Sequence, residues 1–185
     1  MVWTVILIVV GVLLLAIVVL LIYAATQPSA FRVQRSANIQ APPERIFPHI
    51  NDFHSWGAWS PWEKLDPNLK RTFSGPASGV GSTYAWEGNK KVGQGRMEIT
   101  EATEPSKIAI KLDFIKPFEA HNTAEFTLAR NGQSTDLTWA MLGHKPFLFK
   151  VMSVFMDMDK MIGKDFEAGL ANLKAIAEQP ASATR

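Results

Sequence analysis

The sequence predicts an α+β fold in which a curved antiparallel sheet of about seven strands wraps around a long C-terminal helix, preceded by one transmembrane helix. Three observations predict it. Residues 2–25 contain no charged side chain. Residues 31–142 contain short runs in which apolar and polar residues alternate, the pattern of half-buried strands. Across 147–177 apolar residues recur at every third or fourth position, as in an amphipathic helix.

Composition excludes several classes of function. The length of 185 residues suits one domain with an appendage. The 19 Lys and Arg exceed the 17 Asp and Glu by only two, and no basic run could follow a nucleic-acid backbone, so we expect no nucleic-acid partner. The chain has no cysteine, which excludes disulfides, thiol catalysis and zinc–thiolate sites. Nothing in the sequence indicates an oligomeric state.

The N-terminal apolar segment predicts a membrane anchor. As a helix, residues 2–25 would be about 36 Å long, against about 30 Å for the hydrocarbon core of a bilayer. Trp3 and Tyr23 lie near its ends, where aromatic side chains meet the lipid headgroups. A cleaved signal peptide is the alternative, because the small residues Ala24 and Ala25 could suit a peptidase. Against it, no Lys or Arg precedes the apolar run.

The span also suggests an orientation and a division of the chain. The nearest positive side chains, Arg32 and Arg35, follow the span, so the positive-inside rule favours a single-pass protein with a cytoplasmic domain. We expect a transmembrane anchor at 1–25, a linker at 26–30, one folded domain at 31–178 and a disordered tail at 179–185.

The folded part begins with a strand and two short helical pieces. Residues 31–41 alternate, with Phe31, Val33 and Ile39 on one face. Pro42, Pro43 and Glu44 then suit the first turn of a helix. The segment WGAWSPW (56–62) has a tryptophan at every third position, which indicates a single turn or a 3₁₀-like helix. Further strands are expected at 72–74, 82–87, 92–102, 107–115, 121–129 and 134–142, the last two joined by an Asn131-Gly132 hairpin.

The last predicted element is one amphipathic helix over 147–177. Consecutive antiparallel strands with one solvated face need a cover for the other face, and this helix is the obvious candidate. It carries a cluster of methionines, Met152, Met156, Met158 and Met161. Methionine adapts to irregular shapes, so these side chains indicate either ordinary core packing or a deformable pocket wall.

Several motifs resemble one superfamily. The element order is similar to the helix-grip fold of the START/polyketide-cyclase superfamily, often called SRPBCC, and the resemblance covers about residues 31–177. The details resemble its polyketide cyclase/dehydrase-like branch: APPERIF at 41–47, WGAWSPW at 56–62, Gly79-x-Gly81 before Tyr84-x-Trp86, GQGRMEIT at 93–100, and FIKPFE at 114–119. The resemblance implies an internal cavity whose mouth is capped by the short helices, so that the tryptophans of 56–62 would form a lid over the entry. It does not imply one reaction, because the superfamily includes lipid carriers, metabolite binders and cyclases.

Strand registers predict an apolar cavity with few polar groups. The apolar side chains must face the helix, which turns charged residues such as Glu98 and Asp113 outward. The inward set contains almost no titratable group, and its polar candidates are Arg35, Tyr84 and Asn122. The histidines have no metal-ligand spacing, so we expect no metal site and no cofactor. The weak catalytic candidates are Tyr84, His121, Asn122 and Arg35.

The apolar candidates form a ligand-binding set. Of the clustered tryptophans, Trp59 and Trp62 are typical of core residues, whereas Trp56, beside Gly57, is the better candidate for a ligand or membrane contact. Trp86 and Trp139 are expected to line the cavity. The predicted ligand-binding residues are Trp56, Trp59, Tyr84, Trp86, Met97, Leu112, Phe114, Phe126, Trp139, Met141, Met152 and Phe155.

The sequence is compatible with three alternative functions. The first is a membrane-anchored domain that binds a hydrophobic small molecule, such as a lipid, an isoprenoid or a polyketide-like compound, in an apolar cavity. The second, implied by the resemblance, is a polyketide cyclase or dehydratase-like enzyme; the scarcity of inward titratable groups favours the non-enzymatic reading. The third is an interaction protein whose own side chains plug the cavity.

Overall fold

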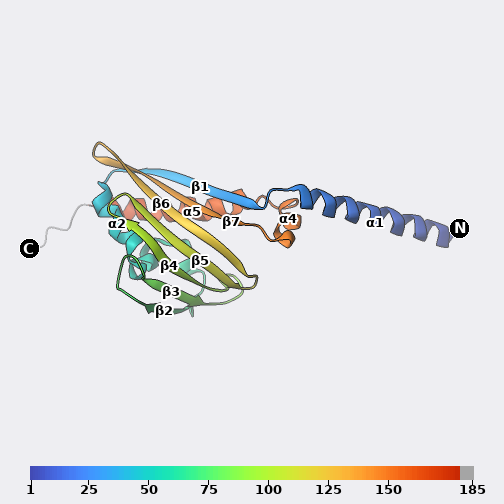
Figure 1. Cartoon of the computed structure of the whole chain (residues 1–185), viewed down its shortest axis with the longest axis horizontal. Coiled ribbons are helices and arrows are strands. Elements are labelled where there is room, and N and C mark those ends of the chain that lie inside the picture. The colour runs from blue at the N-terminus through green and yellow to red at the C-terminus, as the bar shows by residue number, and fades with distance from the viewer. Residues whose placement is uncertain (180–185) are drawn as a thin grey trace, which may run out of the picture.

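The computed structural model describes residues 1–179 and shows the predicted α+β fold (Figure 1). One antiparallel sheet contains seven strands in the order β1-β7-β6-β5-β4-β3-β2. Apart from Gln179, the predicted tail lies outside the described residues. The elements are α1 (Val2–Thr26), β1 (Ala30–Ile39), α2 (Pro43–Asn51), the 3₁₀ turn η1 (Phe53–Ser55), α3 (Trp56–Trp59), the 3₁₀ turn η2 (Pro61–Lys64), β2 (Lys70–Ser74), β3 (Thr83–Glu87), β4 (Gln94–Thr103), β5 (Lys107–Lys116), β6 (Ala120–Asn131), β7 (Ser134–His144), α4 (Phe147–Ser153) and α5 (Met158–Ala177).

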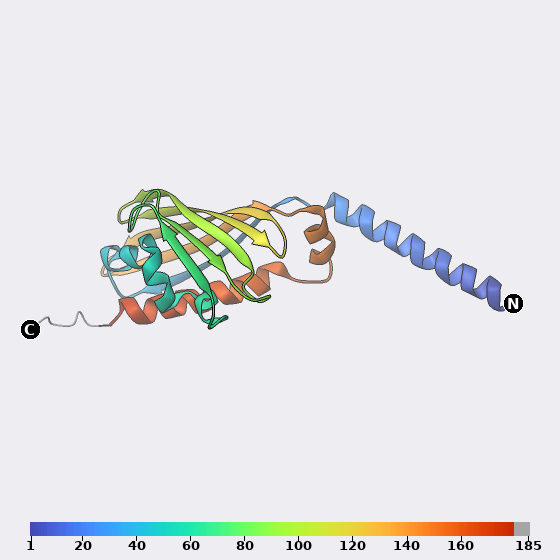
Figure 2. The ribbon, with the colours of Figure 1, turned by 90° about the horizontal axis from the view of Figure 1, so that it is seen from below.

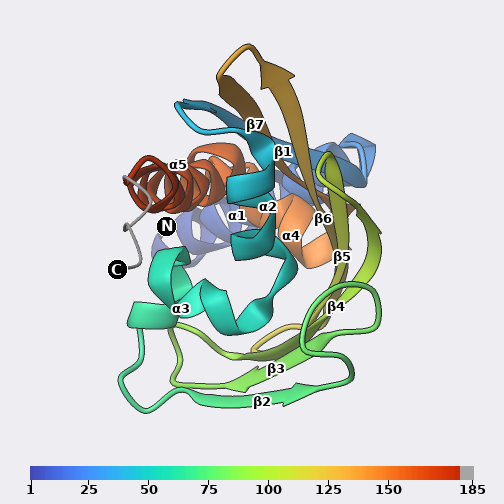
Figure 3. The ribbon, with the colours of Figure 1, turned by 90° about the vertical axis from the view of Figure 1, so that its left-hand side faces the viewer.

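The sheet curves around α5 and the short helices. Seen from its end, it forms an open half-barrel, with α5, α2 and α3 on the concave side (Figure 3); the perpendicular view shows α5 running along that face (Figure 2). Ile110 and Leu137 from the strands are fully buried, as is Leu173 from α5. The period-two and period-3.6 apolar patterns therefore meet in one core, as predicted.

Irregularities in β4 help the sheet to bend and leave room for aromatic side chains. The register against β5 shifts between Gln94 and Gly95 and again between Ile99 and Glu101, and such bulges increase local twist and bend a strand. Gly95 pairs with Trp86 across the β3–β4 ladder. A Cβ atom on Gly95 would lie 2.4 Å from the Trp86 ring, so only glycine lets this indole lie flat against β4.

The prediction of one helix over 147–177 is wrong, because the structure divides this segment into α4 and α5. Asp157 lies in extended backbone between them, and its side chain accepts a hydrogen bond from the backbone N–H of Lys160 at 3.1 Å. An aspartate that caps new N–H groups begins a helix and does not continue one. Met152 therefore lies on α4 and Met156 between the helices, and neither belongs to α5.

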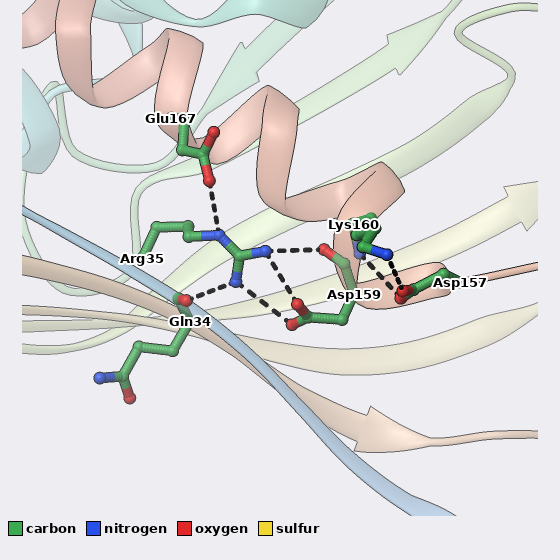
Figure 4. Close-up of polar contacts among 6 residues, drawn as sticks. All are labelled: Gln34, Arg35, Asp157, Asp159, Lys160 and Glu167. Carbon is green, nitrogen blue, oxygen red and sulfur yellow. Dashed lines mark hydrogen bonds and ion pairs between the residues drawn. The ribbon is translucent and has the colours of Figure 1, made fainter.

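An ion-pair cluster fastens the first half of α5 to β1 (Figure 4). Arg35 of β1 donates from Nη2 to Asp159 Oδ2 and from Nε to Glu167 Oε1, both at 2.8 Å. These hydrogen bonds, that of Asp159 first, raise the pKa of the Arg35 guanidinium. Gly163 lies beneath the guanidinium, where a Cβ atom would come within 2.0 Å of Nη2. The absence of a side chain at Gly163 thus lets Arg35 reach both carboxylates.

Replacing Gly163 by alanine is expected to destabilise the protein. Helix propensity alone predicts the opposite, a gain of about 1 kcal/mol for Gly→Ala in a helix. The new methyl group would displace the Arg35 guanidinium, however, and overpacking typically costs about 1–3 kcal/mol. We expect the thermal unfolding midpoint of the full chain in detergent, followed by near-ultraviolet circular dichroism, to fall by several degrees.

Gly57→Ala is the matched control. Gly57 lies in the helical turn α3, and apart from its chain neighbours and the backbone of its own helical turn no described atom lies within 4 Å of the Cβ position there. This variant should unfold at or above the wild-type temperature. A Gly163→Ala protein that gained stability as the control does would contradict the role assigned to Arg35.

Candidate functional site

A cavity of about 410 Å³ lies between the concave face of the sheet and α5. Its wall is largely apolar and aromatic, the usual character of a small-molecule site. Residues from the sequence prediction that line it are Trp56, Tyr84, Trp86, Met97, Leu112, Phe114, Asn122, Trp139 and Met141. The wall also contains residues that sequence reasoning did not place there: Phe31, Trp62, Glu63, Ala124, Phe149, Ile162, Asp165 and Phe166.

The clustered tryptophans close one end of this cavity and cap a helix at the same time. Trp59 Nε1 donates to the carbonyl of His49, and Trp56 Nε1 donates to that of Ile50, each at 3.0 Å. These carbonyls belong to the last turn of α2, where helices leave acceptors without partners. Trp59 is fully buried in the core, whereas Trp56 and Trp62 contact the cavity.

Stacked rings form the side of the cavity next to α5. Trp139 stacks on Phe166 with ring centroids 4.1 Å apart and planes 5° from parallel, and on Phe126 at 4.9 Å. Phe126 is fully buried behind Trp139. The ring of Trp139 thus lies between the sheet and α5, and it holds the helix against the β6–β7 side of the sheet.

The structure places the other predicted ligand-binding residues away from the cavity wall. Trp59 and Phe126 lie in the core beside it. Met152 is half-buried on α4, and Phe155 is 73 % exposed between α4 and α5. The periodicity of 147–177 put the last two on an inward helical face, but the break at Asp157 interrupts that face.

Two catalytic candidates also lie outside the cavity. Arg35 is in the inward register, opposite Trp139, but its guanidinium pairs with α5. His121 lies on the outer face with its side chain 68 % exposed, and its Nδ1 lies 2.7 Å from Asp113 Oδ1. Asp113 itself faces outward, as its register predicts. Tyr84 and Asn122 are the catalytic candidates that do reach the cavity.

A buried carboxylate that sequence reasoning missed pairs with Tyr84. Glu63 of η2 accepts a hydrogen bond from the Tyr84 hydroxyl at 2.6 Å and another from Arg71 Nε at 2.7 Å. Burial, and then the hydrogen bond with Glu63, raise the pKa of Tyr84. The phenol therefore keeps its proton and donates a hydrogen bond to Glu63. Glu63 lies in an irregular segment without periodicity, so no register placed it.

Two further polar groups line the wall. Burial raises the pKa of Asp165, on α5. On the opposite side, Asn122 is 9 % exposed, and its Oδ1 has no hydrogen-bond partner among the described residues. A Cβ atom on Gly143 would lie 1.9 Å from that oxygen, so the glycine makes room for the amide.

The cavity opens at the end of the sheet where α4 lies. The wall residues near the tryptophans, such as Trp56 and Glu63, are buried. Three wall residues at the other end are exposed: Lys116 at the end of β5, Phe118 in the β5–β6 turn and Pro146 in the β7–α4 connection. A ligand would therefore reach the cavity between α4 and the β5–β6 turn. The expected tryptophan lid over the entry is wrong, because hydrogen bonds to α2 hold Trp56 and Trp59 at the closed end.

Known structures share this fold at low sequence identity. Protein CV1439 from Chromobacterium violaceum is 17% identical, with a TM-score of 0.57, over 83% of this chain and 100% of that one. The Aha1 dimer from Colwellia psychrerythraea is 16% identical, with a TM-score of 0.57, over 80% and 97%. The di-domain ARO/CYC StfQ from the steffimycin biosynthetic pathway is 10% identical, with a TM-score of 0.62, over 82% and 51%. No curated protein sequence matches this chain.

The sequence pattern of one protein family matches nearly all of the folded part of this chain. The family of polyketide cyclases/dehydrases and lipid transport proteins matches residues 30–178, from the first residue of β1 to the residue after α5. Together with the seven-stranded sheet wrapped around α5, this match confirms the resemblance found in the motifs. The chain is a member of the polyketide cyclase/dehydrase and lipid transport family, with the helix-grip fold.

Proposed function

We propose that this chain is a membrane-anchored binding protein that holds a hydrophobic small molecule, such as a lipid, an isoprenoid or a polyketide-like compound. The observation that carries the proposal is the apolar cavity of about 410 Å³ that opens at one end of the sheet. Its volume falls within the range of about 300–1,000 Å³ that is typical of small-molecule sites. The family description, which names lipid transport, supports the same class of ligand.

The paired groups Glu63, Arg71 and Tyr84 favour binding over reaction. Arg71 balances the negative charge of Glu63, and the Tyr84 hydroxyl donates a hydrogen bond to Glu63. A ligand would thus gain most of its affinity from apolar burial, at about 25 cal/mol per Å². Asn122 is suited to hydrogen-bond a single polar group of such a ligand. A cavity of this size does not favour the third hypothesis, an interaction protein with a plugged interior.

Helix α1 is the basis for proposing that the protein is anchored in a membrane. It is 25 residues long and apolar enough to span a bilayer, and hydrophobic ligands partition into bilayers. An anchor would keep the cavity within a short linker of that reservoir. From Arg32 and Arg35, the nearest positive residues, we propose that the domain lies on the cytoplasmic side.

The direct test is native mass spectrometry of the full chain, purified in mild detergent from the membrane of its own cell. We expect a population heavier than the bare chain by the mass of one apolar compound, which organic solvent should extract. The proposal would be abandoned if the chain carried no such compound and also bound none of three added probes: a fatty acid, an isoprenoid alcohol and a sterol.

A substitution that fills the cavity should abolish this occupancy. Leu112 is half-buried and faces the cavity, whereas its neighbour Lys111 is exposed on the outer face. Leu112→Trp places a large ring in the space for the ligand, so the ligand-bound fraction in native mass spectra should fall severalfold. Lys111→Trp adds the same ring outside and should leave it unchanged. Equal occupancy in the two variants would contradict binding in this cavity.

The second candidate function is catalysis, and the observation that favours it is the position of Asp165 on the cavity wall with a raised pKa. A carboxyl group with a raised pKa on a cavity wall is a form of group that general acid–base catalysis uses. The co-purifying compound can be incubated with the chain and its mass followed. A loss of water that Asp165→Asn abolishes would establish a dehydratase; an unchanged mass would support the binding protein.

The raised pKa of Tyr84 gives an independent prediction, namely that this residue does not exchange its proton during the function of the protein. Because its pKa is raised, the Tyr84 phenol should remain protonated at pH 10, where an ordinary tyrosine is about half ionised. The chain has only two tyrosines, so the difference in 295 nm absorbance between wild type and Tyr84→Phe isolates this group. Glu63→Gln should move its titration to lower pH, because the carboxylate is lost. Half-ionisation of Tyr84 below pH 10 would contradict this arrangement.

A further inference from the structure

An exposed apolar surface lies around α4, which we call the apolar rim. It consists of Phe118 in the β5–β6 turn, Phe147 and Leu148 on α4, and Phe155 and Met156 after it. Their exposed fractions are 47, 51, 52, 73 and 44 %. A cluster of large apolar side chains in contact with water marks a surface that binds something. None of these residues is buried in the core, and among them only Phe118 lines the cavity.

The apolar rim is held beside the predicted membrane span. Helix α1 packs against α4, and α1 projects from the end of the domain where α4 lies (Figure 1). The backbone N–H of Lys145, just before α4, donates to the carbonyl of Ser29, just after α1, at 2.7 Å. If α1 spans a bilayer, this hydrogen bond and the short linker keep the rim close to its surface.

The apolar rim also borders the opening of the cavity. Phe118 meets Phe149 of α4 edge to face, with ring centroids 5.6 Å apart, and both rings belong to the cavity wall. Two cavity-wall residues beside them, Lys116 and Lys145, carry positive charge. Long basic side chains beside apolar ones suit an interface where the apolar groups lie among lipids and the charges reach the headgroups.

We propose that the apolar rim rests in the headgroup region of the bilayer that α1 spans, so that the cavity opens into the membrane and not into water. This inference rests on the proposed function in taking α1 as a membrane anchor. It goes further in assigning a docking surface and a route: the ligand passes from the bilayer between α4 and the β5–β6 turn. The Phe118–Phe149 contact separates the cavity from the lipid and must open for passage.

Because the chain has no cysteine, single labelled thiols can report directly how deep the apolar rim lies in the bilayer. Phe155→Cys and Phe118→Cys each introduce a single thiol for a nitroxide label, in the full chain reconstituted into phosphatidylethanolamine/phosphatidylglycerol vesicles. Ala129→Cys is the control, because Ala129 is exposed near the β6–β7 hairpin, at the other end of the sheet. Collision with oxygen, which concentrates in lipid, is compared with collision with a water-soluble nickel chelate.

Labels at 155 and 118 should collide more with oxygen than with the nickel chelate, and the label at 129 should show the reverse. A label at 155 that meets the chelate as freely as the label at 129 would overturn the proposal. So would a label shielded from both reagents, because that result would mean that protein, such as a second copy of the chain, covers the apolar rim. This readout needs no ligand, so it stands even if the cavity binds nothing.

A kinetic measurement tests the route. Phe155→Glu combined with Met156→Glu places charges on the apolar rim, far from the tryptophan end of the cavity. The variant should load a fluorescent fatty acid from vesicles severalfold more slowly than wild type, yet reach the same final occupancy. Unchanged loading would refute the route through the rim, whereas absence of loading in both proteins would refute the proposed function instead.

Discussion

The site depends on how α5 is held against the sheet. Arg35 of β1 fastens the first half of the helix through Asp159 and Glu167, and the stacked rings of Trp139 and Phe166 fasten the same part of the helix to β7. Both contacts lie on the β1–β7 side of the sheet. The strands on the other side, β3 to β5, curve away from the helix, and the cavity lies in the space that remains.

The two ends of the cavity are closed by different kinds of contact. At one end, the indole N–H groups of Trp56 and Trp59 bind the last carbonyls of α2, so the tryptophan segment is fixed to the fold and closes the cavity. At the other end, the wall is formed by α4 and the β5–β6 turn, whose side chains are exposed or half-buried. One end is therefore closed by hydrogen-bonded core residues and the other by surface residues that can separate at lower cost.

Much of this arrangement could be predicted from the sequence, because β-strands have a strict period of two. Alternation alone turned Trp86, Met97 and Leu112 inward and Glu98 and Asp113 outward, and the structure has the same registers. The seven-stranded sheet around a C-terminal helix followed from the same patterns and from the family motifs.

The sequence predictions failed where the chain has no periodic pattern of apolar residues, and where such a pattern continues past the end of a helix. Glu63 lies in a 3₁₀ turn directly after Trp62, where no register indicates which way a side chain points. The apolar period of 147–177 runs through Asp157, so it concealed the break between α4 and α5. That break separates Phe155 from the core and leaves it exposed between α4 and α5.

The central claim is that the space beneath β3 to β5 is a permanent apolar cavity that holds a ligand. The most direct measurement is a crystal structure of the full chain, purified from its own membrane without a delipidating step. The account predicts continuous, non-protein electron density in contact with Trp86 and Phe166. A cavity closed by collapsed side chains, or one filled only with ordered water, would contradict it.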